Sequence, residues 1–357
     1  MDTGKSPGML KWVKPVIVAA LTGGVLMTAP AGRTAGPDAP QVVVSIKPVH
    51  SLIAGVMQDL GEPALLIEGA ASPHSYRLRP SQARALAEAD LVFWMGARLE
   101  SFLDKPLEVL VRHGRVITLY EDAGLQFLPA RAGGAWDHHA ERPDHGPEHG
   151  HDHETPEGAE GHRDAHAHGS DDGGPGHQEA LRHAGYDLHV WLDPQNARRI
   201  VEAAVTALTG ADPANGPRYA ENGRRMIQRL EALDEALGAR LAPVRRAPYV
   251  VFHDAYHHLE HRYALRAVGS LSVSPERAPG ARRLSEIRAR IVALGVRCVF
   301  SEPQFTPALA ETVVAGTPAR LAELDPLGAA IPAGPEAYFH LMQTLADALA
   351  GCLSEPG

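Results

Sequence analysis

Histidine and carboxylate side chains are concentrated in one segment of the chain, residues 136–177. This segment holds 10 of the 20 histidines, interleaved with Asp, Glu and Gly and with hardly an apolar residue. Imidazole beside carboxylate is the ligand mixture that borderline divalent metals prefer, although a solvated linker of accidental composition is an alternative. So little apolar content cannot offset the entropy of ordering, so we expect a disordered loop. Its predicted auxiliary metal ligands are His138, His139, His145, His149, His151, His153, His162, His166, His168 and His177.

Three histidines outside this loop lie where a fold could bring them together. His74 lies in a loop between an expected strand and helix, His189 precedes a Val-Trp-Leu-Asp-Pro stretch, and His253 directly follows the apolar run 249–252. A histidine of this kind, taken alone, is more often a structural or surface residue than a metal ligand. Together, beside a metal-attracting segment, they favour a metal site. Three neutral imidazoles suit Zn²⁺, whereas Mn²⁺ would favour more carboxylate.

A second histidine pattern allows a different reading. His257, Glu260 and His261 spell H-x-x-E-H, which matches the inverted zinc-protease motif. On a helix the two histidines would share a face, and the glutamate could act as a base. A five-residue match has a high chance rate in a chain with 20 histidines. We therefore keep a zinc-dependent hydrolase as an alternative. The other interpretation of this stretch is a partly exposed helix face without catalytic function.

Apolar runs alternate with stretches of helical periodicity along most of the chain. The strands expected from these runs are 42–46, 91–95, 116–119, 249–252, 298–300 and 320–324. The helices expected between and after them are 51–60, 81–89, 99–113, 284–294, 307–314 and 336–353. Strands that alternate with helices predict parallel sheets covered on both faces. We expect an α/β fold with two lobes, residues 41–210 and 244–357, each a mostly parallel sheet flanked by helices.

One long helix should join these two lobes. Residues 219–241 contain no proline, and their apolar side chains recur at three- and four-residue steps. A helix of this length, within a linking segment over 213–243, predicts a rigid strut between the lobes. Ligands of open α/β sheets bind at the carboxyl ends of strands, so we expect the metal site in the interlobe cleft.

The beginning of the chain has the pattern of a secretory signal. Lys5, Lys11 and Lys14 come first, an apolar run over 16–27 follows, and Ala29-Pro30-Ala31 offers a cleavage site. The run is shorter than the roughly 20 apolar residues that a membrane span needs. No Cys near the cleavage site could carry a lipid. We predict a signal peptide over 1–31 and export to the periplasm without a lipid anchor.

Cysteine content and charge narrow the class of protein further. The only two cysteines, Cys298 and Cys352, indicate a disulfide in an exported chain, with two buried thiols as the alternative. The formal net charge of −9 argues against a nucleic-acid binder, whose contact surface would be basic.

Eight short motifs occur in order along the chain. They are Ser45-Ile46-Lys47-Pro48, Ser72-Pro73-His74 with Tyr76 and Leu78-Arg79-Pro80-Ser81, Ala89-Asp90-Leu91, His189-Val190-Trp191-Leu192-Asp193-Pro194, Phe252-His253-Asp254-Ala255-Tyr256, Pro279-Gly280-Ala281, Ser301-Glu302-Pro303-Gln304-Phe305 and Leu324-Asp325-Pro326-Leu327-Gly328. Together they resemble the high-affinity zinc-uptake substrate-binding proteins of ABC transporters. The likeness runs from about residue 41 to residue 353, interrupted by the histidine-rich segment.

This resemblance implies two lobes joined by a rigid helix, with Zn²⁺ as the transported ligand held between them. It places the metal ligands at His74, His189 and His253, and it pairs Cys298 with Cys352. Some relatives have a glutamate immediately before the first histidine, where this chain has Pro73. The fourth ligand is then either Asp325 or water, and Asp325 has the alternative role of orienting a ligand without touching the metal.

The expected function is a monomeric periplasmic protein that captures Zn²⁺ and delivers it to an inner-membrane ABC permease. The alternatives are the hydrolase described above, a manganese-binding member of the same family, and a metal-buffering regulatory protein that acts through its loop.

Overall fold

The computed structural model describes residue 4 and residues 39–131, 185–272 and 280–354. The predicted signal peptide, apart from residue 4, and the ten histidines of the predicted auxiliary loop lie outside these residues. Within the described residues, no helix is both long and apolar enough to cross a bilayer.

The N-terminal lobe is built on a four-stranded sheet in which every pair of neighbouring strands is parallel. Its order is β2-β1-β3-β4. The strands are β1 (Val42–Val44), β2 (Ala64–Leu65), β3 (Leu91–Trp94) and β4 (Arg115–Thr118). The helices that follow them are α1 (Lys47–Val56), α2 (Pro80–Glu88), α3 (Asp104–Leu110) and α4 (Leu119–Asp122).

The C-terminal lobe repeats this arrangement. Its sheet has the order β6-β5-β7-β8, again with parallel neighbours. The strands are β5 (Tyr249–Val251), β6 (Ala267–Ser270), β7 (Cys298–Ser301) and β8 (Arg320–Glu323). The helices are α8 (His257–Tyr263), α9 (Ala281–Ala293), α10 (Ala308–Val314) and α11 (Ala337–Leu353). The predicted fold class, two α/β lobes with parallel sheets, is confirmed.

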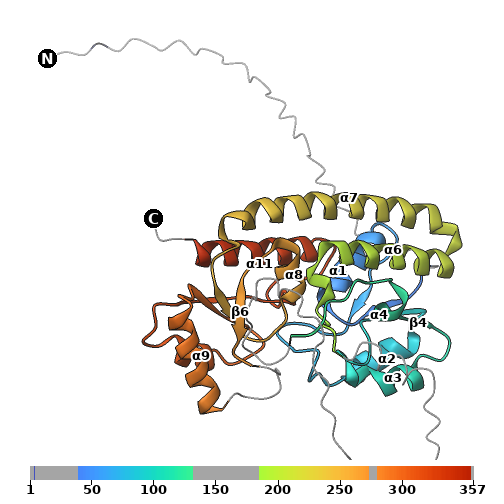
Figure 1. The fold of residues 1–357 in the computed structure, drawn as a ribbon. Coiled ribbons are helices and arrows are strands. Elements are labelled where there is room, and N and C mark those ends of the chain that lie inside the picture. The colour runs from blue at the N-terminus through green and yellow to red at the C-terminus, as the bar shows by residue number, and fades with distance from the viewer. Residues whose placement is uncertain (1–3, 5–38, 132–184, 273–279, 355–357) are drawn as a thin grey trace, which may run out of the picture. The chain divides into compact units, whose positions relative to one another are not determined.

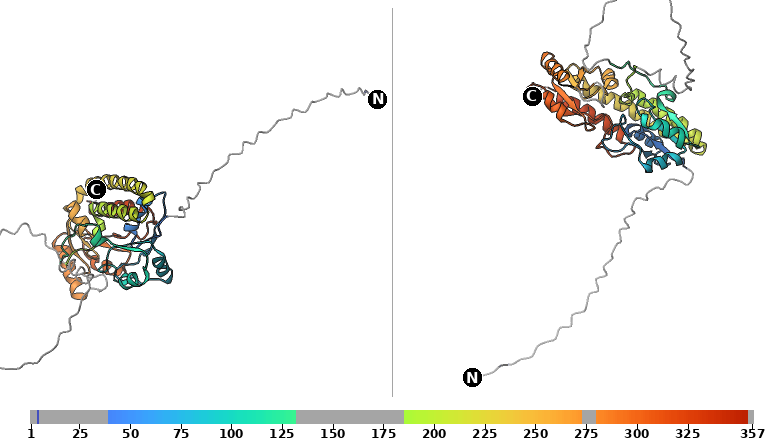
Figure 2. Two further views of the ribbon diagram at one scale, coloured as in Figure 1. Left: turned by 90° about the vertical axis from the view of Figure 1, so that its right-hand side faces the viewer. Right: turned by 90° about the horizontal axis from the view of Figure 1, so that it is seen from below.

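The predicted long helix is also confirmed. It is α7 (Gly216–Leu241), 26 residues long, and it lies in the chain between the two sheets. Its buried face includes Met226, Leu230 and Leu233, in agreement with the periodicity of the sequence. α7 packs against α1, against α6 (Pro194–Ala211) and against α11, so helices of both lobes form one layer above the sheets (Figure 1). The further views keep the yellow α7 beside the green α6 (Figure 2).

The apolar core passes from one lobe into the other. Along β5, Tyr249 and Val251 face a cluster that also contains residues of β1, β3 and α7, whereas Val250 faces a smaller cluster beneath α9 and α10. Successive side chains of a strand point to opposite faces, so one face of the C-terminal sheet shares its core with the N-terminal lobe. α1 and α7 approach closely at Gly55, where a Cβ would lie 2.4 Å from Sδ of Met226.

Several predicted elements differ from the structure. The helix expected over 99–113 is replaced by a 3₁₀ turn (Ser101–Leu103) followed by the short α3. Pro106 has no amide hydrogen and fits only the first turn of a helix, which is why α3 begins just before it. The strands β2 and β6 and the helix α6 were not predicted. β2 has only two residues, and β6 reads Ala-Val-Gly-Ser, a weak strand pattern.

The two cysteines form the predicted disulfide. Cys298 begins β7 and Cys352 lies in the last turn of α11, with 6.2 Å between their Cα atoms. The bond therefore fastens the C-terminal helix to the amino end of a central strand.

Candidate metal centre

The fold brings together the three histidines that the sequence predicts as ligands. One potential ligand atom from each of His74, His189 and His253 lies within 4.8 Å of those of the other two. The Nε2 atoms of His189 and His253 are 3.4 Å apart. Two nitrogens that bind one tetrahedral Zn²⁺ at about 2.0–2.1 Å are separated by about 3.4 Å, so this pair already has the spacing of zinc ligands.

The position of each histidine is set by the strand or helix next to it in the chain. His253 lies two residues after β5, at the carboxyl end of a central strand. His74 lies in the loop between β2 and α2, and His189 immediately precedes a 3₁₀ turn (Val190–Leu192) that leads into α6. The group therefore draws on segments that both lobes contribute, as expected for an interlobe site.

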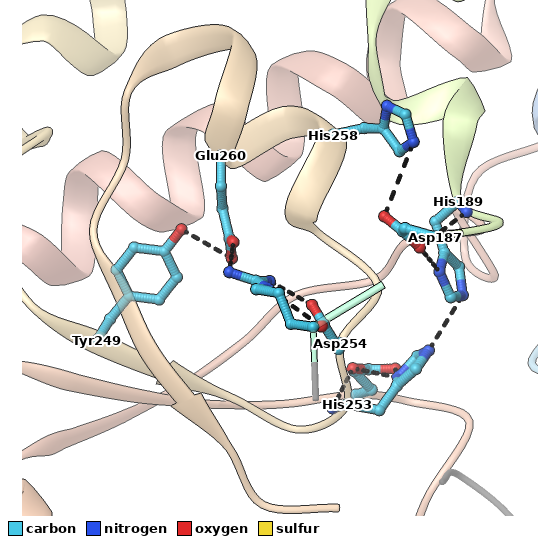
Figure 3. A network of polar contacts seen from close by, with 9 residues as sticks. Asp187, His189, Tyr249, His253, Asp254, His258 and Glu260 are labelled. Atoms are coloured by element: carbon cyan, nitrogen blue, oxygen red, sulfur yellow. Dashed lines mark hydrogen bonds and ion pairs between the residues drawn. The ribbon is translucent and has the colours of Figure 1, made fainter. Parts of the chain in front are cut away.

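Glu302 orients His253. It directly follows β7, the neighbour of β5, so both residues emerge at the same edge of the sheet. Nδ1 of His253 lies 2.8 Å from Oε1 and 2.7 Å from Oε2 of this carboxylate, and the backbone amide of His253 also donates to Oε1. Burial lowers the pKa of His253, but the nearby carboxylates of Glu302, Asp254 and Asp187 together raise it, and the net shift is upward. With Nδ1 donating, Nε2 is the atom that faces the imidazole of His189 (Figure 3).

Asp187 orients His189 in the same way. Its Oδ1 lies 2.8 Å from Nδ1 of His189 and accepts from the backbone amide of the same residue at 3.1 Å. Burial, and secondarily the proximity of His253, lowers the pKa of His189 to about 3. The imidazole is therefore neutral at physiological pH. Its contact with Asp187 is a hydrogen bond to a neutral ring, and its Nε2 keeps a free lone pair.

His74 is the third member of the group, and one of its ring nitrogens has no hydrogen-bond partner among the described residues. This nitrogen, Nε2, is buried. Burial, followed by the proximity of His189 and His253, lowers its pKa to about 3. Unpaired buried polar atoms are rare and need an explanation. A cation bound by all three lone pairs supplies one.

A small cavity of about 10 Å³ lies at this group. Its lining combines the three histidines with apolar and polar side chains; besides the histidines, it is lined by Ser72, Pro73, Trp191, Glu302, Gln304, Phe305, Pro326 and Leu327. Phe305 packs edge-on against the ring of His253, and Trp191 packs edge-on against the ring of His189. These rings limit the space to little more than one ion and hold the imidazoles in place.

The structure does not bring Asp325 into the histidine group. Its Oδ1 accepts from the backbone amides of Leu327 and Gly328, both at 3.0 Å, and from Nε2 of Gln304 at 2.8 Å. Its Oδ2 accepts from the amide of Ala329. Three donors therefore engage Oδ1 and one engages Oδ2, and the group of possible metal ligands contains the three histidines without Asp325. Asp325 instead shapes the loop that contributes Pro326 and Leu327 to the cavity.

The same loop is held from the N-terminal lobe by Lys47. This buried residue at the start of α1 donates through Nζ to the carbonyls of Gly328, Ala329 and Ile331, the last two at 3.0 and 2.8 Å. The three donors of an ammonium are thus all engaged by backbone acceptors of the other lobe. Lys47 and Asp325 together fix the carbonyls and the amides of one loop.

The H-x-x-E-H stretch forms α8, but it does not form a second metal site. Glu260 is buried, lies 2.7 Å from Nη1 of Arg131 through Oε2 and accepts a hydrogen bond from Tyr249. Arg131 also pairs with Asp254, the residue after His253 (Figure 3). Among the described residues, no group of metal-ligand spacing includes His257 or His261. Glu260 therefore serves an interlobe ion pair, and this geometry does not support the hydrolase hypothesis.

Two residues that support the ligands were not predicted from the sequence. Asp187 stands two residues before His189, and Glu302 lies two residues after the strand predicted over 298–300, inside one of the motifs. A carboxylate that orients a ligand histidine is a common second partner of metal sites. The position of Glu302 at the end of a strand neighbouring that of His253 was the available signal.

Comparison with known proteins identifies the family. The family described as zinc-uptake complex component A periplasmic (ZnuA) matches residues 42–352. This chain belongs to that family. The high-affinity zinc uptake system protein ZnuA of Brucella suis is 43% identical over 339 residues, which cover 95% of this chain and 98% of that protein. The protein of the same name from Yersinia pestis is 32% identical over 343 residues, which cover 96% and 98%.

Solved structures of the family share the fold. A crystal structure of ZnuA superposes with a TM-score of 0.67 at 22% identity and covers 89% of this chain and 100% of that one. A structure described as a 138–173 deletion mutant of ZnuA with zinc bound gives the same TM-score and identity, and it covers 90% of this chain and 100% of that one.

Proposed function

We propose that this chain captures one Zn²⁺ between its two lobes and delivers it to an ABC-type permease in the inner membrane. The ligands proposed are His74, His189 and His253. The observation that carries the proposal is the convergence of three imidazoles, those of His189 and His253 buried and that of His74 partly buried, whose potential ligand atoms lie within 4.8 Å of one another. Family relatives named as high-affinity zinc uptake proteins support the choice of metal and of process.

The chemistry of the group favours capture over catalysis. A catalytic zinc site keeps an open position and a poised acid or base. Here the carboxylates of Asp187 and Glu302 are engaged with the Nδ1 atoms of His189 and His253, and the cavity is small. Three nitrogen ligands also favour Zn²⁺ over Mn²⁺, which prefers carboxylate oxygen.

Two further segments, the beginning of the chain and the histidine-rich segment, have roles of their own in this function. We propose that residues 1–31 direct export and are removed, and that the mature protein acts as a periplasmic monomer. The histidine-rich segment would bind further zinc more weakly than the histidine group. Its side chains would gather zinc when it is scarce and pass it to the cleft. The family description, which places its members in the periplasm, supports the location.

Calorimetric zinc titration of single variants tests the ligand assignment. The background should lack residues 137–177, because the histidines of that segment add binding sites. His74→Ala, His189→Ala and His253→Ala should each weaken zinc binding at least tenfold, since each removes one of only three nitrogen ligands. His113→Ala, which changes an exposed histidine, is the matched control. Near-unchanged affinity in any one of the three variants would remove that residue from the site.

A further inference from the structure

Three imidazoles leave one position of a tetrahedral zinc site without a protein ligand. Gln304 lines the same cavity, and its side-chain oxygen Oε1 is a neutral ligand type that zinc accepts. This atom is buried and accepts no hydrogen bond from any described residue. An amide oxygen carries two lone pairs, so leaving it buried and unused costs free energy.

The neighbours of Gln304 fix which end of its amide faces Asp325. Nε2 of Gln304 donates to Oδ1 of Asp325 at 2.8 Å. That oxygen already accepts from the backbone amides of Leu327 and Gly328. This carboxylate oxygen can only accept hydrogen bonds. The end of the glutamine amide that faces it must therefore be the NH₂ group, which donates, and not the carbonyl oxygen. The hydrogen-bond network therefore settles the amide orientation and turns Oε1 away from Asp325.

We propose that Gln304 is the fourth zinc ligand, through Oε1, and that Asp325 is the positioning residue that holds its amide in this orientation. The proposal rests on the function proposed above. A cavity of about 10 Å³ is close to the minimum that holds a single water molecule, so an ion leaves no room for an added water. Direct ligation by a side chain already in the wall fills the fourth position without one.

This arrangement also explains how a carboxylate near the site can affect the metal without touching it. Three imidazoles and an amide are all neutral ligands, so the bound ion keeps its full double charge. A carboxylate ligand would neutralise part of that charge and would shift the preference toward Mn²⁺. Withholding Asp325 from the metal, by engaging it with backbone amides, keeps the ligand set suited to zinc.

The test uses Gln304→Met, which keeps the length of the side chain and removes the oxygen. In the background that lacks residues 137–177, this variant should bind zinc at least tenfold more weakly. Its Co²⁺ complex should show altered visible d–d bands, because these bands report the number and type of ligand atoms. Gln343→Met, on the exposed face of α11, is the matched control and should change neither quantity. A lower unfolding temperature with unchanged affinity and unchanged Co²⁺ bands would overturn the assignment.

A double-mutant cycle tests the role of Asp325. Asp325→Asn can donate as well as accept, so it no longer holds the Gln304 amide in one orientation, and zinc binding should weaken. Added to Gln304→Met, the same substitution should cost little more, because both act through one atom. Equal losses in both backgrounds would show that Asp325 acts independently and would overturn its positioning role. Failure of the proposed function itself is a separate result, namely a parent protein that binds no zinc or binds it independently of the three histidines.

Discussion

Oδ1 of Asp187 lies 2.8 Å from Nδ1 of His189 and fixes the tautomer of that ring. The carboxylate oxygen accepts, so Nδ1 carries the hydrogen and the lone pair of Nε2 faces the cavity. The ring cannot rotate without breaking this bond.

Asp187→Leu should weaken zinc binding about 10- to 100-fold, because the ligand histidine loses the partner that orients it. Asp187→Asn retains an oxygen acceptor and should preserve most of the affinity. Calorimetry on both variants measures the difference. Equal affinities of the parent and the leucine variant would show that the hydrogen bond has no part in binding.

Arg131→Met should destabilise the protein by about 3 kcal/mol, because it leaves the buried carboxylate of Glu260 and the partly buried carboxylate of Asp254 without their cation. Chemical denaturation of the metal-free protein measures this loss, and adding Glu260→Gln should recover part of it. Arg240→Met is the control, since its pair with Asp347 is exposed and should be worth less than about 1 kcal/mol. A loss in Arg131→Met no larger than in the control would contradict the importance of the interlobe pair.

Glu100→Gln should change how stability depends on pH. Burial raises the pKa of this fully buried carboxyl from 4.5 to about 7, and its Oε2 accepts from the amide of Met95. A carboxyl whose pKa is raised on folding stabilises the fold fully below pH 4.5, and this contribution is lost as the pH rises to about 7. The total loss is about 3 kcal/mol at most.

Glutamine stays neutral throughout, so the Glu100→Gln variant should gain stability relative to the parent between pH 5 and pH 8. Urea denaturation at the two pH values measures the change. Glu108→Gln removes an exposed carboxylate of α3 and controls for net charge. The same difference between variant and parent at both pH values would rule out a buried, neutral Glu100.

Replacing Cys298 and Cys352 by serine should lower stability by about 4 kcal/mol on the chain-entropy model, because the disulfide closes a loop across 54 positions. Zinc affinity at 25 °C should stay within about threefold of the parent. Cys298 begins β7, whereas Glu302 follows the opposite end of that strand. Thermal unfolding and calorimetry give the two quantities. A tenfold loss of affinity would mean that the disulfide shapes the site directly.

Sequence patterns predicted the central strands and the long helix because these elements have strong local signals. β1, β3 and β5 are continuous apolar runs, and α7 repeats its apolar residues at helical steps. The edge strands β2 and β6 gave no such signal, because tertiary pairing with β1 and β5 makes them strands. The sequence did contain a signal for the start of α6, although the helix was not predicted. Asp193 caps the helix by accepting from the amide of Gln195, and Pro194 takes the first helical position.

The residues of the site also differ in whether the sequence alone could predict them. His74, His189 and His253 could be selected from motifs and from their places beside strands and helices. Their supporting carboxylates required knowledge of which strands are neighbours, because Glu302 reaches His253 only through the pairing of β5 with β7. Asp325 follows a strand as a ligand would, yet the backbone amides of its own loop engage it. Backbone hydrogen bonds of this kind have no residue signature.

The apolar core that passes between the lobes makes the described body of the protein one cooperative unit. Tyr249 and Val251 of the C-terminal sheet belong to the same cluster as Val43 and Phe93 of the N-terminal sheet. Neither half could be separated without exposing that shared face to water, so neither should melt alone. A ligand bound between them stabilises the whole chain, by about 4 kcal/mol when its free concentration is a thousand times Kd. Zinc is then both the cargo of the protein and a stabilising ligand, so a lower zinc supply should shorten the lifetime of the protein against proteolysis.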